Sequence, residues 1–168
     1  MEQESDLAVP AARMVSIALR EVQRAGLDAR RALARRLGLK LSDVNALDQI
    51  IFSAEPLGPA ELGARLGMRS ASATILADRL ERAGHIKRIP HPHDRRRQSL
   101  VLTEHARAEV AAALRPMLAA LEETAAELTR AQADTVFSYL TRAAKVMRDY
   151  ARDPAAAEQD SDPGTFTG

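Results

Sequence analysis

The sequence contains no cysteine, so disulfide bonds, thiolate metal sites and redox-active thiols are excluded. Tryptophan is absent and only 3% of the residues are aromatic, so the core must be built from aliphatic side chains. Hydrophobic residues still make up 46% of the chain, and a composition rich in Ala and Leu favours helices. No apolar run reaches the roughly 18–20 residues of a membrane span. The acidic start MEQESDLAVP lacks the apolar segment of a signal peptide. These absences predict a cytoplasmic protein with no membrane partner.

Charge is distributed unevenly along the chain, although the net charge is only +1. The segment from Gly58 to Thr103 holds nine cations and four anions, a net charge of +5. From Arg152 to the end, one cation faces four anions, a net charge of −3. A basic middle followed by an acidic end indicates a segment that faces a polyanion and a solvated tail.

Apolar residues at three-and-four spacing predict four helices before position 84. The first runs from Pro10 to Leu37, with Gly26 as a point where it loosens or breaks. The second, DVNALDQIIFSA, has Ser42 as its N-cap, and a third, short helix begins at Pro59. The fourth spans about 70–83 with Ser70 as its cap, and its inward residues are Ala73, Leu76, Ala77 and Leu80.

After position 84 the spacing of apolar residues changes from the pattern of a helix to that of a β-strand. The short segments HIKRI and QSLVLT are β-prone, and between them lie two prolines and the charged run HDRRR, which predicts a hairpin with a long loop. Thr103 caps a following helix that reaches about Leu128, and a last helix covers about 130–151. The remainder, 152–168, has the composition of a disordered acidic tail.

Three compact helices followed by a hairpin define a winged helix-turn-helix within a mainly α-helical fold. Small polar residues on the outer side of the helix at 70–83 would let it lie deep in the major groove, where base edges differ from pair to pair. The wing, 90–98, carries three arginines, which suit a narrow minor groove. Asp94 is expected to hold one arginine by a bidentate pair and to orient the others. The order of elements thus predicts binding to double-stranded DNA.

Two stretches, ADRLERAGHIKR and HPHDRRRQSLVLT, carry a further resemblance. Their Asp-Arg-Leu-Glu and Asp-Arg-Arg motifs, with Gly84, Ile86 and Arg88 between them, resemble MarR-family (multiple antibiotic resistance regulator) transcription factors. The upstream LSDVNALDQI and LGPAELGARLGM fit the same pattern. The resemblance covers roughly 10–151. It implies a homodimer that binds a pseudo-palindromic operator and a repressor that a small molecule releases.

The resemblance also implies a division of the chain. Residues 1–40 and 104–151 would form the dimerisation region, and 41–103 the DNA-binding domain. The expected DNA contacts are Arg69, Ser70, Ser72, Thr74, Ile75, Arg79, Arg88, Asp94, Arg95, Arg96 and Arg97. For Arg79, an ion pair with Asp78, Glu81 or Asp94 is an equal alternative. A ligand cleft would be lined by Met14, Ile17, Arg20, Ile51, Phe52 and Met117.

Three other functions compete with this one. The sequence has no nucleophile elbow, Gly-rich phosphate loop or H-E-x-x-H motif, so it predicts no enzyme and no cofactor. His85, His91, His93 and Asp94 near the wing are possible metal ligands, but no helix-face H-x-x-x-H pair supports them, which argues against a metal-dependent regulator. The remaining alternative is a winged-helix adaptor for another protein, without specific DNA binding; Ile75 on the outer face favours it.

Overall fold

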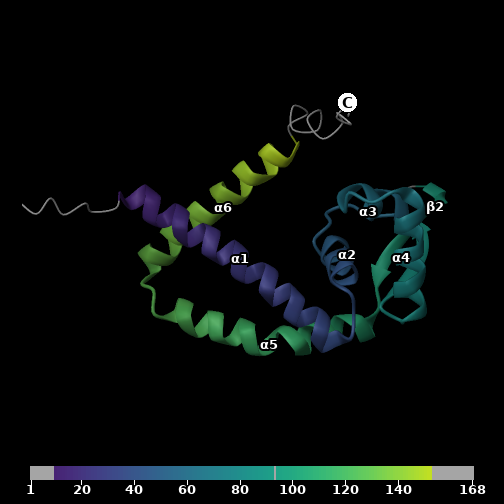
Figure 1. Cartoon of the computed structure of the whole chain (residues 1–168), viewed down its shortest axis with the longest axis horizontal. Helices are drawn as coiled ribbons and strands as arrows, with labels where there is room; N and C mark the ends of the chain where they lie inside the picture. Colours follow the sequence, from purple (N-terminus) through teal and green to yellow (C-terminus); the bar gives the residue numbers. More distant parts are fainter. Residues whose placement is uncertain (1–9, 93, 153–168) are drawn as a thin grey trace, which may run out of the picture. The chain divides into compact units, whose positions relative to one another are not determined.

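The computed structural model describes residues 10–92 and 94–152 (Figure 1). Its elements are α1 (Ala11–Leu37), α2 (Leu41–Ile51), α3 (Pro59–Arg65), α4 (Ser70–Arg82), β1 (Ile86–His91), β2 (Asp94–Leu102), α5 (Glu104–Ala126) and α6 (Arg130–Arg152). They belong to two compact units, Met1–Arg115 and Pro116–Gly168. The predicted fold, mainly helical with one hairpin, is confirmed. The expected acidic tail, apart from Arg152 at the end of α6, lies outside the described residues.

The first helix, α1, is continuous through Gly26, so the predicted break there is wrong. Strong helix formers on both sides hold the helix together despite the cost of one glycine, about 1 kcal/mol. The helix ends at Gly38, whose φ of 63° few other residues adopt readily. Only Leu33 and Ala34 of α1 are buried, so the first two-thirds of this helix presents its apolar residues to solvent.

Two predicted helix caps are also wrong. Lys40, and not Ser42, precedes α2, and Arg69, and not Ser70, precedes α4. At α2 the carboxylate of Asp43 accepts the backbone N–H of Lys40 at 3.2 Å. An acidic side chain at this third helical position satisfies a free N–H just as a capping side chain would. The second helix also ends at Ile51, three residues earlier than the expected Ala54.

The helix-turn-helix is made by α3 and α4, which lie unusually close to each other. A Cβ atom at Gly63 would lie 2.8 Å from the Cβ of Ala73, so only glycine fits there. The turn between the helices contains Gly67 with a φ of 62°, and the backbone N–H of Met68 bonds the carbonyl of Gly63 at 2.9 Å. These small residues fix the position of α4 against α3.

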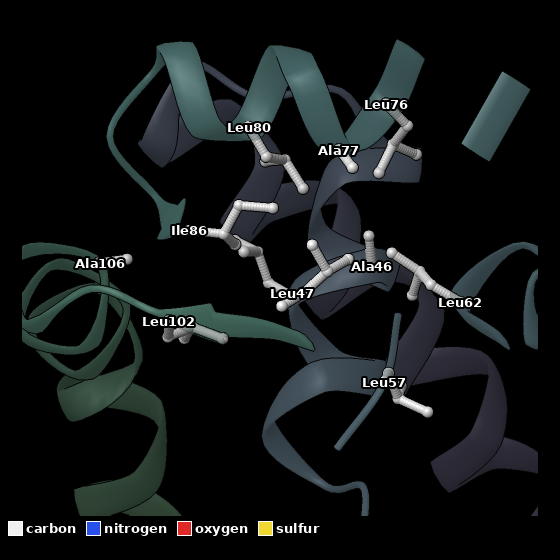
Figure 2. Packing of buried hydrophobic residues seen from close by; sticks show 11 residues of the cluster. Ala46, Leu47, Leu57, Leu62, Leu76, Ala77, Leu80, Ile86, Leu102 and Ala106 are labelled. Carbon is white, nitrogen blue, oxygen red and sulfur yellow. The ribbon is translucent and has the colours of Figure 1, made fainter. Parts of the chain in front are cut away.

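The core of the winged helix is aliphatic, as the composition predicted. Figure 2 shows side chains of α4 and α2 pointing toward one another, with Ile86 of the hairpin beside them. The cluster consists of Ala46, Leu47, Leu57, Leu62, Leu76, Ala77, Leu80, Ile86, Leu100, Leu102 and Ala106. Burying one leucine contributes about 2 kcal/mol. The hairpin is attached to this core because the N–H of Leu100 also bonds the carbonyl of Leu57 at 2.7 Å.

The hairpin is longer than predicted and its loop is shorter. Strand β2 begins at Asp94, so the three arginines lie in a strand and not in a long loop. The antiparallel register pairs Ile86 with Leu102 and Pro90 with Gln98, and it shifts after Pro90. A two-stranded ribbon leaves most side chains in solvent, so arginines are tolerated in it. Proline fits where the ladder becomes irregular, because it has no N–H to donate.

The predicted cap of α5 is confirmed. The hydroxyl of Thr103 accepts the N–H of Ala106 at 3.1 Å and donates to the carbonyl of Gly84 at 2.7 Å. The predicted last helix is likewise confirmed as α6. Within 116–151 no residue is buried. No helix in the described ranges combines the length and apolarity needed to cross a membrane.

Candidate nucleic-acid interface

The outer side of α4 carries the side chains that were expected to face DNA. Ser70, Ser72, Thr74 and Ile75 are exposed, whereas the buried residues are the four predicted ones, Ala73, Leu76, Ala77 and Leu80. Helical periodicity alone therefore identified both faces. The hydroxyl of Thr74 donates to the carbonyl of Ser70 at 3.1 Å. This back-bond leaves Thr74 with an acceptor and a methyl group for any ligand. Arg69, just before the helix, is also exposed.

Arg79 forms an ion pair, but with a partner that sequence reasoning did not consider. Its guanidinium holds Asp43 of α2 in a bidentate pair, with Nε 3.3 Å from Oδ2 and a second bond to Oδ1. The Asp43 side chain is only 3% exposed, whereas that of Arg79 is 35% exposed. The hydrogen bond to Asp43 raises the pKa of Arg79, which thus stays charged. The pair joins α2 to α4, so the main role of Arg79 is to hold these two helices together.

Arg88 connects the hairpin to α4. One of its guanidinium nitrogens lies 2.5 Å from Oδ1 of Asp78, and another bonds Glu81. The backbone N–H of Arg88 also donates to Glu81 at 3.2 Å. With its side chain mostly buried and both carboxylates engaged, Arg88 fixes the angle between the base of the wing and α4.

The arginines of the wing have different surroundings. Arg97 pairs with Glu61 of α3, and the side chain of Arg96 is exposed. Asp94 accepts the backbone N–H of Arg96 at 3.0 Å. The expected bidentate pair of Asp94 would have to involve Arg95, whose side chain lies outside the described residues. Arg96 is therefore the described wing arginine with the clearest access to a phosphate or a groove.

Glu61 was missed by sequence reasoning, yet it holds the wing against α3. Its carboxylate accepts the backbone N–H groups of Glu61 itself and of Gly58, and it pairs with Arg97. These contacts outweigh partial burial and lower the pKa of Glu61. A Glu three residues after Gly58 in GPAE was a detectable cap signal. Its pairing with residue 97 was not, because that contact spans 36 positions.

The described wing histidines are apart, because His85 precedes β1 and His91 ends it; the ring of His85 instead lies near that of His105, with centroids 6.3 Å apart. His85 is buried, with Nε2 3.2 Å from Oε2 of Glu109. His91 ends β1, and His93 lies outside the described residues. Among the described side chains, no group of three His, Cys, Asp or Glu is placed to hold a metal ion. The hypothesis of a wing metal site, which needs His93, stays untested.

The predicted ligand-cleft residues come from different elements of the chain. Met14, Ile17 and Arg20 lie on the first half of α1, and Ile51 and Phe52 at the end of α2; all five are exposed. Met117 belongs to the other compact unit. A cavity of about 270 Å³ lies elsewhere, beside α4, and is lined by Lys40, Ser42, Met68, Ser72, Ile75, Leu76 and Arg79.

The architecture is that of a winged helix-turn-helix protein, and comparison with known proteins identifies its family. Residues 37–97 match the model of the MarR family. The chain is 33% identical, over 70% of its length and 76% of the relative, to the uncharacterized HTH-type transcriptional regulator YcgE of Bacillus subtilis. The chain therefore belongs to the MarR family of transcriptional regulators. Because these are not enzymes, the prediction of a non-enzymatic regulator is confirmed.

Solved structures support the same fold. The transcriptional regulator Tm0710 of Thermotoga maritima is 26% identical, covering 83% of this chain and 98% of its own, with a TM-score of 0.60. CouR of Rhodococcus jostii, whose structure contains p-coumaroyl-CoA, is 22% identical, covering 79% and 90%, with a TM-score of 0.55. A MepR mutant from a multidrug-resistant clinical isolate of S. aureus is 16% identical, covering 79% and 96%, with a TM-score of 0.64.

Proposed function

We propose that this regulator is a homodimer that binds a pseudo-palindromic DNA operator. The recognition helix, 70–83, would lie in the major groove and the wing, 90–98, in the adjacent minor groove. The observation that carries this proposal is the exposed outer side of α4 next to a hairpin that Arg88 ties to the same helix. Such a link holds helix and wing in a fixed relative orientation before DNA binds, which reduces the entropy lost on binding.

The predicted contact residues then take two roles. Direct contacts are assigned to the exposed Arg69, Ser70, Ser72, Thr74, Ile75, Arg96 and Arg97, and to Arg95. Asp94 orients the turn by holding the N–H of Arg96. Arg79 and Arg88, which are engaged by carboxylates and only partly exposed, are positioning residues; Arg97 also pairs with a carboxylate but is exposed. This division predicts that mutating the two groups has different consequences for folding and for DNA affinity.

Dimerisation is proposed from residues that one chain leaves exposed. Large apolar side chains are exposed along α1, the second half of α5, and α6; they include Val22, Leu27, Leu121, Phe137 and Val146. Monomeric proteins rarely expose long apolar stripes of this kind. In the proposed domain organisation, residues 1–40 and 104–151 form the dimerisation region, and 41–103 form the DNA-binding domain. Two-fold symmetry would set the recognition helices roughly 34 Å apart.

A small-molecule effector and repression complete the proposal. Support comes from the exposed apolar side chains of Met14, Ile17 and Phe52, which would line a cleft once a second chain is present. CouR, a protein of similar fold, was crystallised with p-coumaroyl-CoA bound, which supports a ligand-responsive role for this chain as well. We place the regulator in the cytoplasm, where DNA and metabolites meet.

The proposal is tested by fluorescence anisotropy with a labelled duplex from the region upstream of the gene and a scrambled duplex. Wild type should bind the first more tightly, and Arg96→Ala should weaken this binding. The slope of log affinity against log salt is negative, and each lost phosphate contact makes it shallower by about 0.9, so the loss of Arg96 from two wings should make it shallower by about 1.8. Arg142→Ala on α6 is the charge-matched control, and sedimentation velocity checks the dimer. An Arg96→Ala protein with unchanged affinity and slope would refute the assignment of the wing.

The adaptor remains as a second candidate because Ile75, at 60% exposure, is the most exposed large apolar side chain of α4. In that case no duplex selected from a random pool would bind better than a scrambled one. A pool selection that yields a common sequence motif would eliminate the adaptor.

A further inference from the structure

The outermost side of α4 is apolar in its first two turns. With 3.6 residues per turn, the side opposite the buried Ala73, Leu76, Ala77 and Leu80 holds Ala71, Ile75, Asp78 and Arg82. Ala71 and Ile75 are four positions apart and therefore neighbours on the surface. Both are exposed, and Ile75 is 60% exposed. The part of α4 that stands farthest from the core therefore presents a methyl group and a branched aliphatic side chain.

The side chains that make two-pronged contacts to bases are absent from α4 or already hold another group. The helix SASATILADRLER contains no Asn, Gln or Lys, the residues that, with Arg, make two-pronged contacts to adenine or guanine. Arg79 is held by Asp43. Arg82 lies in the last turn, and its Nε donates to the carbonyl of Asp78 at 3.2 Å. The only hydroxyl hydrogen of Thr74 is given to Ser70. In its first two turns the helix therefore offers single hydrogen bonds from Ser70 and Ser72, and no two-pronged contact to a base.

We propose that Ile75, supported by Ala71, recognises the 5-methyl group of thymine in the operator. This inference rests on the proposed DNA-binding function and specifies the base that the helix selects. The thymine methyl is the apolar feature of the major groove, and cytosine lacks it. Contact between Ile75 and this methyl would remove two apolar groups from water. A β-branched side chain is restricted at χ1, so little side-chain freedom is lost when the contact forms. Each half-site of the operator should then contain a thymine opposite Ile75.

Replacing thymine by deoxyuridine tests this contact, because it removes the methyl and leaves base pairing intact. The operator is first obtained by selection from a random pool with the full-length protein. Each thymine is then replaced in both half-sites, and affinity is measured by anisotropy. Burial of one methyl is worth about fourfold in affinity, so replacement of one thymine per half-site should weaken wild type by about sixteenfold for the dimer.

The variant Ile75→Ala should bind the thymine and deoxyuridine duplexes equally well. Ile89→Ala on β1 is the matched control, since it truncates another exposed isoleucine and should keep the full sensitivity to the methyl. Thermal melting verifies that both variants are folded.

Two results would overturn the inference, and they are distinguishable. If wild type binds the selected operator but deoxyuridine has no effect at any position, or if the effect persists in Ile75→Ala, the methyl contact is wrong and DNA binding stands. If selection yields no preferred duplex, the proposed DNA-binding function fails and the inference fails with it.

Discussion

The winged helix and the terminal helices use their apolar residues in opposite ways. Between Leu41 and Thr103, leucines from α2, α3, α4 and the hairpin are buried against one another. Between 116 and 151, no residue is buried, and Phe137 is 74% exposed. The first region has a core of its own, whereas the second carries apolar side chains that its own chain leaves in water. Two sources of stability follow from this difference, one within a chain and one proposed between two chains.

The two sources are distinguishable by protein concentration. Unfolding of a core within one chain does not depend on concentration, whereas a contact between two copies is stabilised by mass action. Mutations in the two regions therefore differ in the kind of effect they have as well as in its size.

The largest expected effect is that of Leu80→Ala in the winged-helix core. Leu80 has no solvent exposure, and truncation of a buried leucine leaves a cavity that costs about 3–4 kcal/mol. We expect this loss in urea unfolding at both low and high protein concentration. Leu121→Ala in α5, where the leucine is exposed in the single chain, is the matched comparison. Its effect on stability should vary with protein concentration.

The comparison fails if both variants behave alike. A concentration-independent loss of similar size in Leu121→Ala would mean that its leucine is buried within its own chain. No loss at any concentration would argue against a dimer contact at that position.

A smaller effect is expected at the ion pair between Arg79 and Asp43. Arg79→Ala leaves the buried Asp43 carboxylate without its cation, which costs about 3 kcal/mol or somewhat less because Arg79 itself is partly exposed. The double variant Asp43→Asn with Arg79→Ala should recover part of this loss, since no buried charge remains unpaired. Arg82→Ala, one turn along at the exposed end of α4, is the control. Chemical denaturation measures all three.

If Arg79→Ala unfolds like wild type but binds DNA weakly, its main role is contact with the duplex. That result would reverse the assignment of Arg79 as a positioning residue.

Local patterns explain what the sequence predicted correctly. The two faces of α4 follow from the helical period, and the Thr103 cap follows from a hydroxyl placed before a helical run. The wrong cap predictions arose because more than one residue near each helix start could satisfy its free N–H groups. Ser42 and Ser70 are good capping residues, but Asp43 already satisfies the N–H of Lys40, and α4 begins without a side-chain cap.

The remaining features of the site depend on contacts between distant positions. Asp43 and Arg79 are separated by 36 residues, so neither side chain alone indicates that it has a partner. The extent of β2 was missed because a run of arginines is not a typical strand sequence. The three arginines fall where the register shifts, between the pairs Pro90–Gln98 and His91–Asp94, and no local pattern indicates such an irregularity. The sequence alone could therefore not tell which arginines contact DNA and which position other elements; that distinction came from the folded structure.

The smallest expected effect is at Thr103, where the hairpin leads into α5. Loss of an N-cap hydroxyl costs about 1 kcal/mol, so Thr103→Ala should lower the free energy of unfolding by about that amount. Thr103→Ser keeps a hydroxyl and should be nearly as stable as wild type. Hydrogen exchange sharpens the comparison further, because the hydroxyl holds the N–H of Ala106 and the carbonyl of Gly84. In Thr103→Ala the amide of Ala106 should exchange faster, while amides around Val136 in α6 should keep their wild-type rates. Faster exchange throughout α6 would instead show that the terminal helices depend on the first turn of α5, and that the two regions do not unfold independently.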